Sequence, residues 1–277
     1  MPVQPESLPD LSDAYPLDDT DIVRYRRDGH VRLSGVLSPG DVAAYRPAIL
    51  DAAMLYNSEK RPIQDRDTYG RAFLQIMNLW VKDQSVRRFT LARRFARIAA
   101  QLMGVDGVRV YHDQALFKEP GGGPTPWHQD QYYWPLDTEH TITMWVPLVP
   151  LKSGLEGMTF ASESQHLGYL GEFEISDRSD AVFRKMIEEK KLKLSSAGEM
   201  QAGDATFHAG WTLHSAPGNP TDTMREVMTV IYFADGAHLT EPDNENRADD
   251  LFWWFPGLKA GDAASSKLNP VVYPSGT

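Results

Sequence analysis

The feature that most constrains the fold is a run of short extended segments that follows Gly104. Up to Ala234 the chain repeats stretches rich in β-branched and aromatic residues, separated by clusters of glycine, proline and asparagine. This pattern is typical of strands joined by turns. About eight such strands without regularly alternating helices favour a mostly β fold with flanking helices, a jelly roll or double-stranded β-helix. The predicted strands are 109–118, 127–133, 141–149, 158–161, 192–195, 204–208, 211–215 and 226–234.

Helices are predicted mainly before this block. Ser38-Pro39-Gly40-Asp41 has the form of a capping box with proline at the first helical position. Glycines at 29 and 104 stand where helices end. Residues 60–80 predict a strand and loop beside a pocket. The predicted helices are 18–29, 38–56, 84–103 and, inside the strand block, 180–191.

The chain of 277 residues has no recognisable linker, so a single domain over residues 1–277 is predicted. Its parts are a helical region at about 18–104, a β core at about 105–235, and a C-terminal segment at 236–277 that wraps over the core.

Charge and cysteine content narrow the classes of partner. A formal net charge of -10 argues against general binding to nucleic acid or anionic membranes. No cysteine is present, so any metal is held by His, Asp or Glu rather than by thiolates. No secretion signal or membrane-spanning segment is recognised, and a cytoplasmic protein is expected. The oligomeric state is not predicted.

The candidate chemistry lies in the stretch Thr125-Pro126-Trp127-His128-Gln129-Asp130. If this run is extended, His128 and Asp130 point to the same side, because strand side chains repeat every second residue. An imidazole and a carboxylate facing one point are two of the three ligands of a 2-His-1-carboxylate Fe(II) site. A second histidine must come from elsewhere in the chain.

Two histidines could supply the third ligand. His208 and His214 are six residues apart, so strand alternation would place both on one face. Gly210 between them could break the strand. Alternation alone therefore leaves both residues as candidates.

Arg225 opens the apolar strand 226–234, which follows a turn after His214. An arginine inside a barrel requires an anion, and a carboxylate matches its planar fork. Fe(II) oxygenases with such a triad commonly use 2-oxoglutarate, whose distal carboxylate would be that anion. The pattern therefore predicts a co-substrate as well as a metal.

Together these motifs resemble the phytanoyl-CoA dioxygenase (PhyH) family of Fe(II)- and 2-oxoglutarate-dependent oxygenases. The resemblance runs from about Asp21 to Asn269-Pro270. Its specific motifs are His128-x-Asp130, Gly203-Asp204, His214, Asn219 and Arg225, with the preceding stretch 112–118.

The resemblance implies a role for each matching residue. Iron would be held by His128, Asp130 and His214, with His208 as a histidine that is not a ligand. The 2-oxoglutarate contacts would be Gln114, Gln129, Trp145 and Arg225.

Two positions depart from the family pattern. Ala216 stands where some members have a serine that touches the co-substrate, and Glu163-Ser164-Gln165-His166 replaces the usual Gly-Ser-His. Asp130 is present, whereas halogenating relatives lack the carboxylate, so hydroxylation or a related oxidation is favoured.

The function implied is hydroxylation of an aliphatic C–H bond of a small molecule, with Fe(II), 2-oxoglutarate and O2 as cofactors and succinate and CO2 as products. The alternative is a cupin-like metalloenzyme, an isomerase or a cofactor-free dioxygenase, that does not use 2-oxoglutarate. Candidate aromatic pocket residues are Tyr132, Tyr133, Trp134, Trp211, Trp253 and Trp254. The acidic chain argues against a CoA thioester as substrate.

Overall fold

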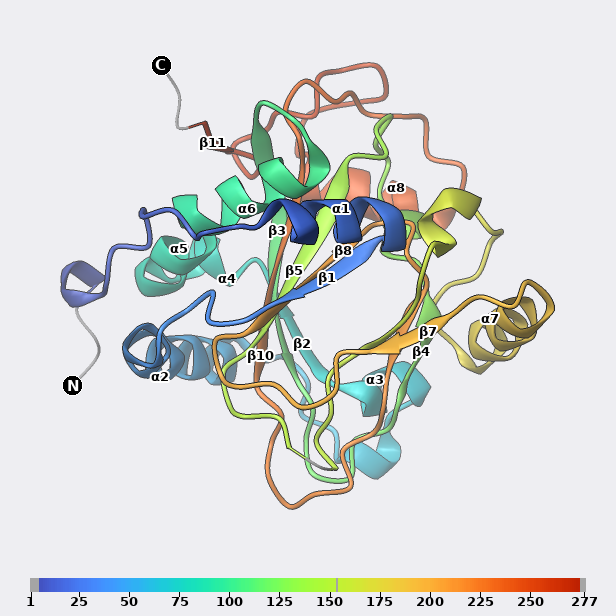
Figure 1. Cartoon of the computed structure of the whole chain (residues 1–277), viewed down its shortest axis with the longest axis horizontal. Helices are drawn as coiled ribbons and strands as arrows, with labels where there is room; N and C mark the ends of the chain where they lie inside the picture. The colour runs from blue at the N-terminus through green and yellow to red at the C-terminus, as the bar shows by residue number, and fades with distance from the viewer. Residues whose placement is uncertain (1–4, 153, 275–277) are drawn as a thin grey trace.

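The computed structural model describes residues 5–152 and 154–274. Within these residues two antiparallel sheets face each other (Figure 1). The larger has the order β1-β8-β5-β10-β3-β11, with β2 also pairing with β3, and the smaller has the order β4-β9-β6-β7. Antiparallel sheets with flanking helices are the architecture that the strand pattern predicts.

The strands are β1 (His30–Leu33), β2 (Leu74–Met77), β3 (Val108–Phe117), β4 (Thr125–His128), β5 (Thr141–Pro147), β6 (Thr159–Ala161), β7 (Leu194–Ser196), β8 (Ala205–Ala209), β9 (His214–Ala216), β10 (Val227–Ala234) and β11 (Val271–Tyr273). The α-helices are α1 (Asp19–Asp28), α2 (Pro39–Tyr56), α3 (Thr68–Ala72), α4 (Leu79–Lys82), α5 (Gln84–Thr90), α6 (Arg93–Met103), α7 (Asp177–Glu189) and α8 (Glu245–Trp254). Short 3-10 helices are η1 (Pro5–Ser7), η2 (Ile63–Asp65), η3 (Asp130–Tyr133) and η4 (Ser164–Leu167).

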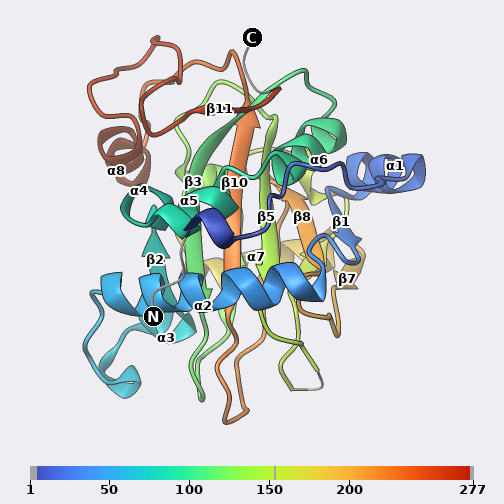
Figure 2. The ribbon, with the colours of Figure 1, turned by 90° about the vertical axis from the view of Figure 1, so that its left-hand side faces the viewer.

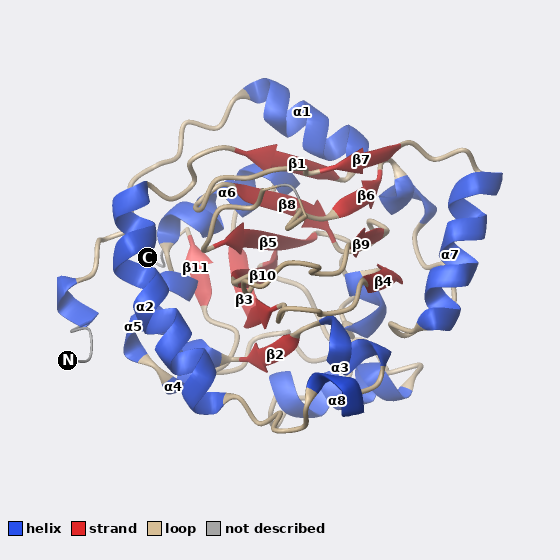
Figure 3. Ribbon diagram, turned by 90° about the horizontal axis from the view of Figure 1, so that it is seen from below, coloured by secondary structure: helices blue, strands red, loops and turns tan. Residues whose placement is uncertain are grey.

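The two faces of the larger sheet have different coverings. Helices α2, α5 and α6 lie over one face (Figure 2), and the smaller sheet lies over the other, with α7 outside it (Figure 3). Alternation along β10 divides its side chains between the two faces. Met228, Val230 and Tyr232 join the core with the helices, whereas Thr229 and Ile231 line the pocket between the sheets.

The predicted helix ends are confirmed where capping residues mark them. Asp18 accepts a hydrogen bond from the backbone N–H of Thr20, and Ser38 forms a capping box with Asp41. Gly29 and Gly104 follow α1 and α6 in the left-handed conformation, with φ of 79° and 76°. Local sequence therefore determines these helix boundaries.

The single helix predicted at 84–103 is wrong. The chain forms α5 and α6, with Ala92 in an extended conformation between them. At the break the backbone N–H of Arg94 donates to the carbonyl of Leu11, 2.9 Å away. This partner lies far away in the sequence, so the apolar stripe alone could not reveal the break.

Two predicted strands are shorter than expected. The segment predicted at 127–133 is extended only to His128 in β4 and then turns into η3. The segment predicted at 211–215 forms a turn before β9 begins. A Cβ on Gly210 would lie 2.3 Å from Thr141 Oγ1, so the chain needs glycine at this close approach.

The remaining segments agree with the predictions in part. The helical insertion begins at Asp177 rather than Asp180, after an N-cap at Ser176. The N-terminal region contributes β1 and β2 to the larger sheet, and β2 confirms the strand predicted within residues 60–80. The C-terminal segment contains α8. No helix in the described ranges combines the length and apolar character needed to cross a membrane.

Asp113 on β3 lies on the helix side of the sheet. Its carboxylate accepts hydrogen bonds from the backbone N–H groups of Leu79 and Trp80 and from the hydroxyl of Thr90, at 2.7 to 2.9 Å. Burial raises the pKa of Asp113 to about 6. This side chain ties α4 and α5 to the sheet.

Asp113→Ala is therefore expected to lower the free energy of unfolding by about 3 kcal/mol, because three buried donors lose their acceptor. Urea denaturation of the two proteins measures the loss. Asp113→Asn keeps one acceptor oxygen and should lose less. Equal stability of the alanine variant and the parent would show that the contacts are dispensable.

Candidate metal centre and its pocket

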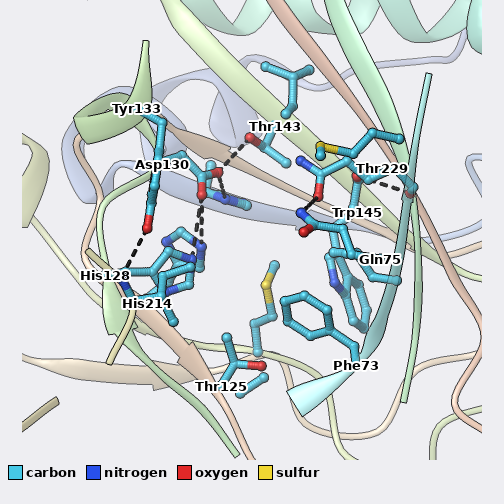
Figure 4. Close-up of a pocket in the computed structure, with 18 of the residues that line it drawn as sticks. Phe73, Gln75, Thr125, His128, Asp130, Tyr133, Thr143, Trp145, His214 and Thr229 are labelled. Atoms are coloured by element: carbon cyan, nitrogen blue, oxygen red, sulfur yellow. Dashed lines mark hydrogen bonds and ion pairs between the residues drawn. The ribbon is translucent and has the colours of Figure 1, made fainter. Parts of the chain in front are cut away.

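Three side chains meet between the two sheets. His128 ends β4 and His214 begins β9, and these residues are paired directly across the antiparallel ladder. Asp130 follows at the first position of η3, after an extended Gln129. One donor atom from each residue lies within 4.8 Å of the others. Figure 4 shows the three side chains pointing toward one another. The predicted proximity of His128 and Asp130 thus arises although the strand ends between them.

Both histidines are oriented by their own backbone. His128 Nδ1 lies 2.8 Å from the carbonyl oxygen of Pro126, and His214 Nδ1 lies 2.9 Å from that of Thr212. A protonated Nδ1 donates in each case, which leaves the Nε2 lone pair available to a metal. Burial, together with the neighbouring histidines, holds the pKa of His214 well below its usual value, which favours the neutral form that metals bind.

The two oxygens of Asp130 have different surroundings. Oδ1 lies 3.5 Å from His128 Nε2 and 3.6 Å from His214 Nε2. Oδ2 accepts a hydrogen bond from the Thr143 hydroxyl at 2.8 Å and lies 3.1 Å from His208 Nε2. Burial raises the pKa of Asp130, but the surrounding histidines outweigh it and hold this pKa well below the usual value. The carboxylate is therefore ionised, with Oδ1 free toward the histidines.

His208 belongs to a different strand and sheet from His214. It lies on β8 of the larger sheet, whereas His214 lies on β9 of the smaller one. Strand parity could not choose between these histidines because they do not share a strand. The centres of the two imidazole rings lie 4.3 Å apart, and His208 contacts Oδ2 of Asp130, the outer oxygen, which faces away from His128 and His214.

The cluster opens into a pocket that contains three of the four predicted co-substrate residues. The three are Gln114 of β3, Trp145 of β5 and Arg225, and they line the pocket together with His128, Asp130 and His214. Gln114 Oε1 accepts a hydrogen bond from Gln75 of β2 at 2.7 Å, and Gln75 lies in the segment predicted to border a pocket.

Gln129 does not line this pocket. Its side-chain amide donates to the carbonyls of Gly168 and Trp211, at 2.9 and 2.7 Å, and is 3% exposed. Residues 128 and 130 face the cluster, so the residue between them faces away. Gln129 therefore connects the loops of Gly168 and Trp211 and does not face the His–Asp–His cluster.

Arg225 is a buried cation without an acidic partner among the described residues. It is 3% exposed, Nη1 donates to the carbonyl of Glu156 at 3.2 Å, and Nε has no hydrogen-bond partner. The guanidinium lies 5.5 Å from the centre of the Trp145 ring. Burial lowers the pKa of Arg225 to about 10, so the group remains charged at neutral pH. An anion is therefore needed beside it.

Thr125 was not recognised from the sequence as a site residue. It lines the pocket and pairs across the ladder with Ala216, the position where a serine was expected. Lys118 lies behind Thr125, with Nζ 3.4 Å from its hydroxyl oxygen. A hydroxyl is thus present beside Ala216, but it comes from the neighbouring strand. The sequence does not show this, because it depends on the register between β4 and β9.

Aromatic side chains also line the pocket. Tyr133 and Trp134, two of the predicted aromatic residues, line it with Phe73. Asp250 of α8 also lines it, and no local motif marks this residue in the sequence. Of the other predicted aromatic residues, Trp211 packs against Tyr169, and Trp253 is exposed.

Solved structures with this fold support the architecture. SnoK, a non-heme alpha-ketoglutarate-dependent carbocyclase from nogalamycin biosynthesis, is 24% identical, with a TM-score of 0.75 over 98% of this chain and 99% of SnoK. EctD from S. alaskensis, solved with 2-oxoglutarate and 5-hydroxyectoine, is 18% identical, with a TM-score of 0.65 over 87% of this chain and 84% of EctD. The predicted double-stranded β-helix is confirmed.

The epimerase SnoN, solved in complex with Fe3+, alpha ketoglutarate and nogalamycin RO, is 27% identical. Its TM-score is 0.75, over 92% of this chain and 98% of SnoN. No curated protein sequence matches the chain.

The family model for phytanoyl-CoA dioxygenase (PhyH) matches residues 25–227, well over half of the chain. With the His–Asp–His cluster, this match confirms the prediction of iron and 2-oxoglutarate as cofactors. The chain belongs to the phytanoyl-CoA dioxygenase family.

Proposed function

We propose that this protein is an Fe(II)- and 2-oxoglutarate-dependent oxygenase that hydroxylates an aliphatic C–H bond of a small molecule. The observation that carries the proposal is that one pocket contains both a His–Asp–His cluster and a buried, unpaired arginine. The cluster suits a ferrous ion, and the arginine suits a carboxylate.

The proposed metal ligands are His128 Nε2, Asp130 Oδ1 and His214 Nε2. Two imidazoles and a carboxylate leave coordination positions open for co-substrate and oxygen. Bound Fe(II) and 2-oxoglutarate supply, with O2, an oxidant able to attack a C–H bond, and succinate and CO2 are released. The protein orients the substrate and excludes water.

The proposed partner of the distal carboxylate of 2-oxoglutarate is Arg225. Thr125 is proposed to donate a hydroxyl hydrogen bond there in place of the serine that some relatives have at position 216. Gln114 and Trp145 are proposed to form the adjacent wall. Gln129 is left out, because its amide already donates to two backbone carbonyls.

Mixing the anaerobic Fe(II) protein with 2-oxoglutarate tests the class of enzyme without knowledge of the primary substrate. A new visible charge-transfer band is expected, and succinate should form slowly only with iron and O2 present. A cupin-like isomerase or cofactor-free dioxygenase predicts neither signal. Their absence would reject the proposal.

The similarity to SnoN favours epimerisation as a second candidate outcome, because SnoN is an epimerase and is 27% identical to this chain. The mass of the product distinguishes the outcomes. Hydroxylation adds one oxygen atom from O2, whereas epimerisation leaves the mass unchanged. Screening metabolites for stimulated O2 uptake, followed by mass spectrometry with labelled O2, measures this.

His208 is proposed to hold the outer oxygen of Asp130 rather than to bind the metal. His208→Leu is therefore expected to weaken Fe(II) binding by about 10- to 100-fold, as for other residues that orient a ligand. His208→Gln keeps a donor and should recover part of this affinity. Iron titration of both variants measures the effect. If His208→Gln abolished turnover while His214→Gln retained it, the ligand assignment would be reversed.

A further inference from the structure

A second carboxylate, that of Asp250, lines the pocket at its Tyr111 end. Along β10, Arg225 precedes the strand, Thr229 and Ile231 line the pocket, and Phe233 follows. The Phe233 ring lies 6.1 Å from that of Tyr111, and the Tyr111 hydroxyl donates to Asp250 Oδ2 at 2.6 Å. Asp250 thus lies on the Phe233 side of the pocket rather than on the side of Arg225.

Asp250 has hydrogen-bond donors but no counter-charge. Besides Tyr111, Trp254 Nε1 donates to Oδ1 at 3.1 Å, and both donors are neutral. No lysine, arginine or histidine forms an ion pair with Asp250 in residues 5–152 and 154–274. Burial raises the pKa of Asp250 to about 7. A carboxylate can accept about four hydrogen bonds, so the two neutral donors leave capacity for another.

A second polar atom at this end also lacks a partner. His112 lines the pocket and is 3% exposed, and its Nδ1 has no hydrogen bond. The His112 ring lies 5.1 Å from both Tyr111 and Trp254, the two residues that donate to Asp250. Two groups that can form further hydrogen bonds, Asp250 and His112, therefore lie at this end of the pocket.

When the site holds Fe(II) and 2-oxoglutarate, the charge of Asp250 has no opposite charge to balance it. Among the described lining residues, Arg225 is the only arginine or lysine. The two charges of Fe(II) and the one of Arg225 offset Asp130 and the two carboxylates of 2-oxoglutarate. Ionised Asp250 is then the remaining charge in the pocket, and a monocation would neutralise it.

A groove beside the pocket also carries net negative charge. Its charged lining residues are four acids, Glu172, Glu174, Asp243 and Glu245, and one base, Arg178. It adjoins the pocket where the backbone N–H of Ile175 donates to the Tyr133 hydroxyl at 2.9 Å. An acidic approach attracts cations and repels anions.

We propose that Asp250 binds a protonated amine of the primary substrate, so that the substrate class is an apolar, ring-bearing amine. Its body would contact Phe73, Tyr133 and Trp134, with the ammonium group against Asp250. This inference rests on the proposed function, since it assigns the substrate of that same pocket.

Matched probes test the proposal by calorimetry on the anaerobic enzyme loaded with Fe(II) and 2-oxoglutarate. The probes are 2-naphthylmethylamine, 2-naphthylmethanol and 2-naphthoate, used at about pH 8, where the amine is protonated. The amine should bind roughly tenfold or more tightly than the alcohol, the scale of a charge-assisted hydrogen bond, and the carboxylate most weakly.

Asp250→Asn should remove the preference for the amine while the alcohol keeps its affinity. Asp249→Asn is the control, because it removes the same charge from the exposed neighbouring position of α8. A preference that survives in Asp250→Asn, equal binding of amine and alcohol, or no binding of either probe would overturn the proposal.

The wild-type order of the three probes decides the question if Asp250→Asn does not fold. The probes can also be titrated without 2-oxoglutarate. Loss of the amine preference with a normal charge-transfer band contradicts only the Asp250 subsite, whereas a missing band contradicts the proposed function.

Discussion

Replacing Asp130 with alanine is expected to lower succinate formation by roughly a thousandfold or more, as for removal of one member of a catalytic set. The variant loses the proposed anionic ligand, whose Oδ1 faces both histidines. It also leaves Thr143 and His208 without the oxygen they contact. Mass-spectrometric measurement of succinate, with iron titration, separates lost turnover from lost binding.

Asp137→Ala is the control for this experiment. Asp137 lies in the same segment, but its side chain is 47% exposed and outside the pocket lining. This variant should keep the parent rate. Full turnover in Asp130→Ala would show that a different carboxylate serves the metal.

Replacing Arg225 with leucine should weaken 2-oxoglutarate binding by about 100-fold. The buried guanidinium is available to pair with a carboxylate, and a charge-assisted bidentate contact contributes about 3 kcal/mol. Titration of the charge-transfer band gives the dissociation constants. The monocarboxylate 2-oxovalerate lacks the distal carboxylate, so its affinity should not depend on Arg225.

The same substitution should not destabilise the protein without ligand. Arg225 is buried without an acidic partner among the described residues, and replacing such a charge with an apolar side chain is often neutral or stabilising. Thermal melting should therefore give an equal or higher midpoint for Arg225→Leu. A large loss of stability together with unchanged 2-oxoglutarate affinity would make Arg225 a structural residue.

The parts of the fold that could be predicted depend on local sequence. The strand block, the cap of Ser38 and the end of α1 at Gly29 follow from patterns within a few residues. The His128–Asp130 pair was also recognisable, because two side chains around one extended residue face the same way.

The remaining features depend on contacts between distant segments. The break between α5 and α6 is stabilised by Leu11, and the position of His208 follows from which sheet its strand joins. Thr125 brings a hydroxyl next to Ala216 only because the two residues are paired in the strand register. Asp250 reaches the pocket because α8 packs over Tyr111. No spacing rule connects these residues.

The hydrogen bonds to Asp130 bear on how many of its oxygens would bind the proposed metal. Thr143 and His208 both contact Oδ2, so turning that oxygen toward the metal would break both contacts. Asp130 is thus suited to bind through one oxygen only. If Asp130 held Fe(II) through one oxygen, more of the coordination sphere would remain available to 2-oxoglutarate and dioxygen than with a chelating carboxylate.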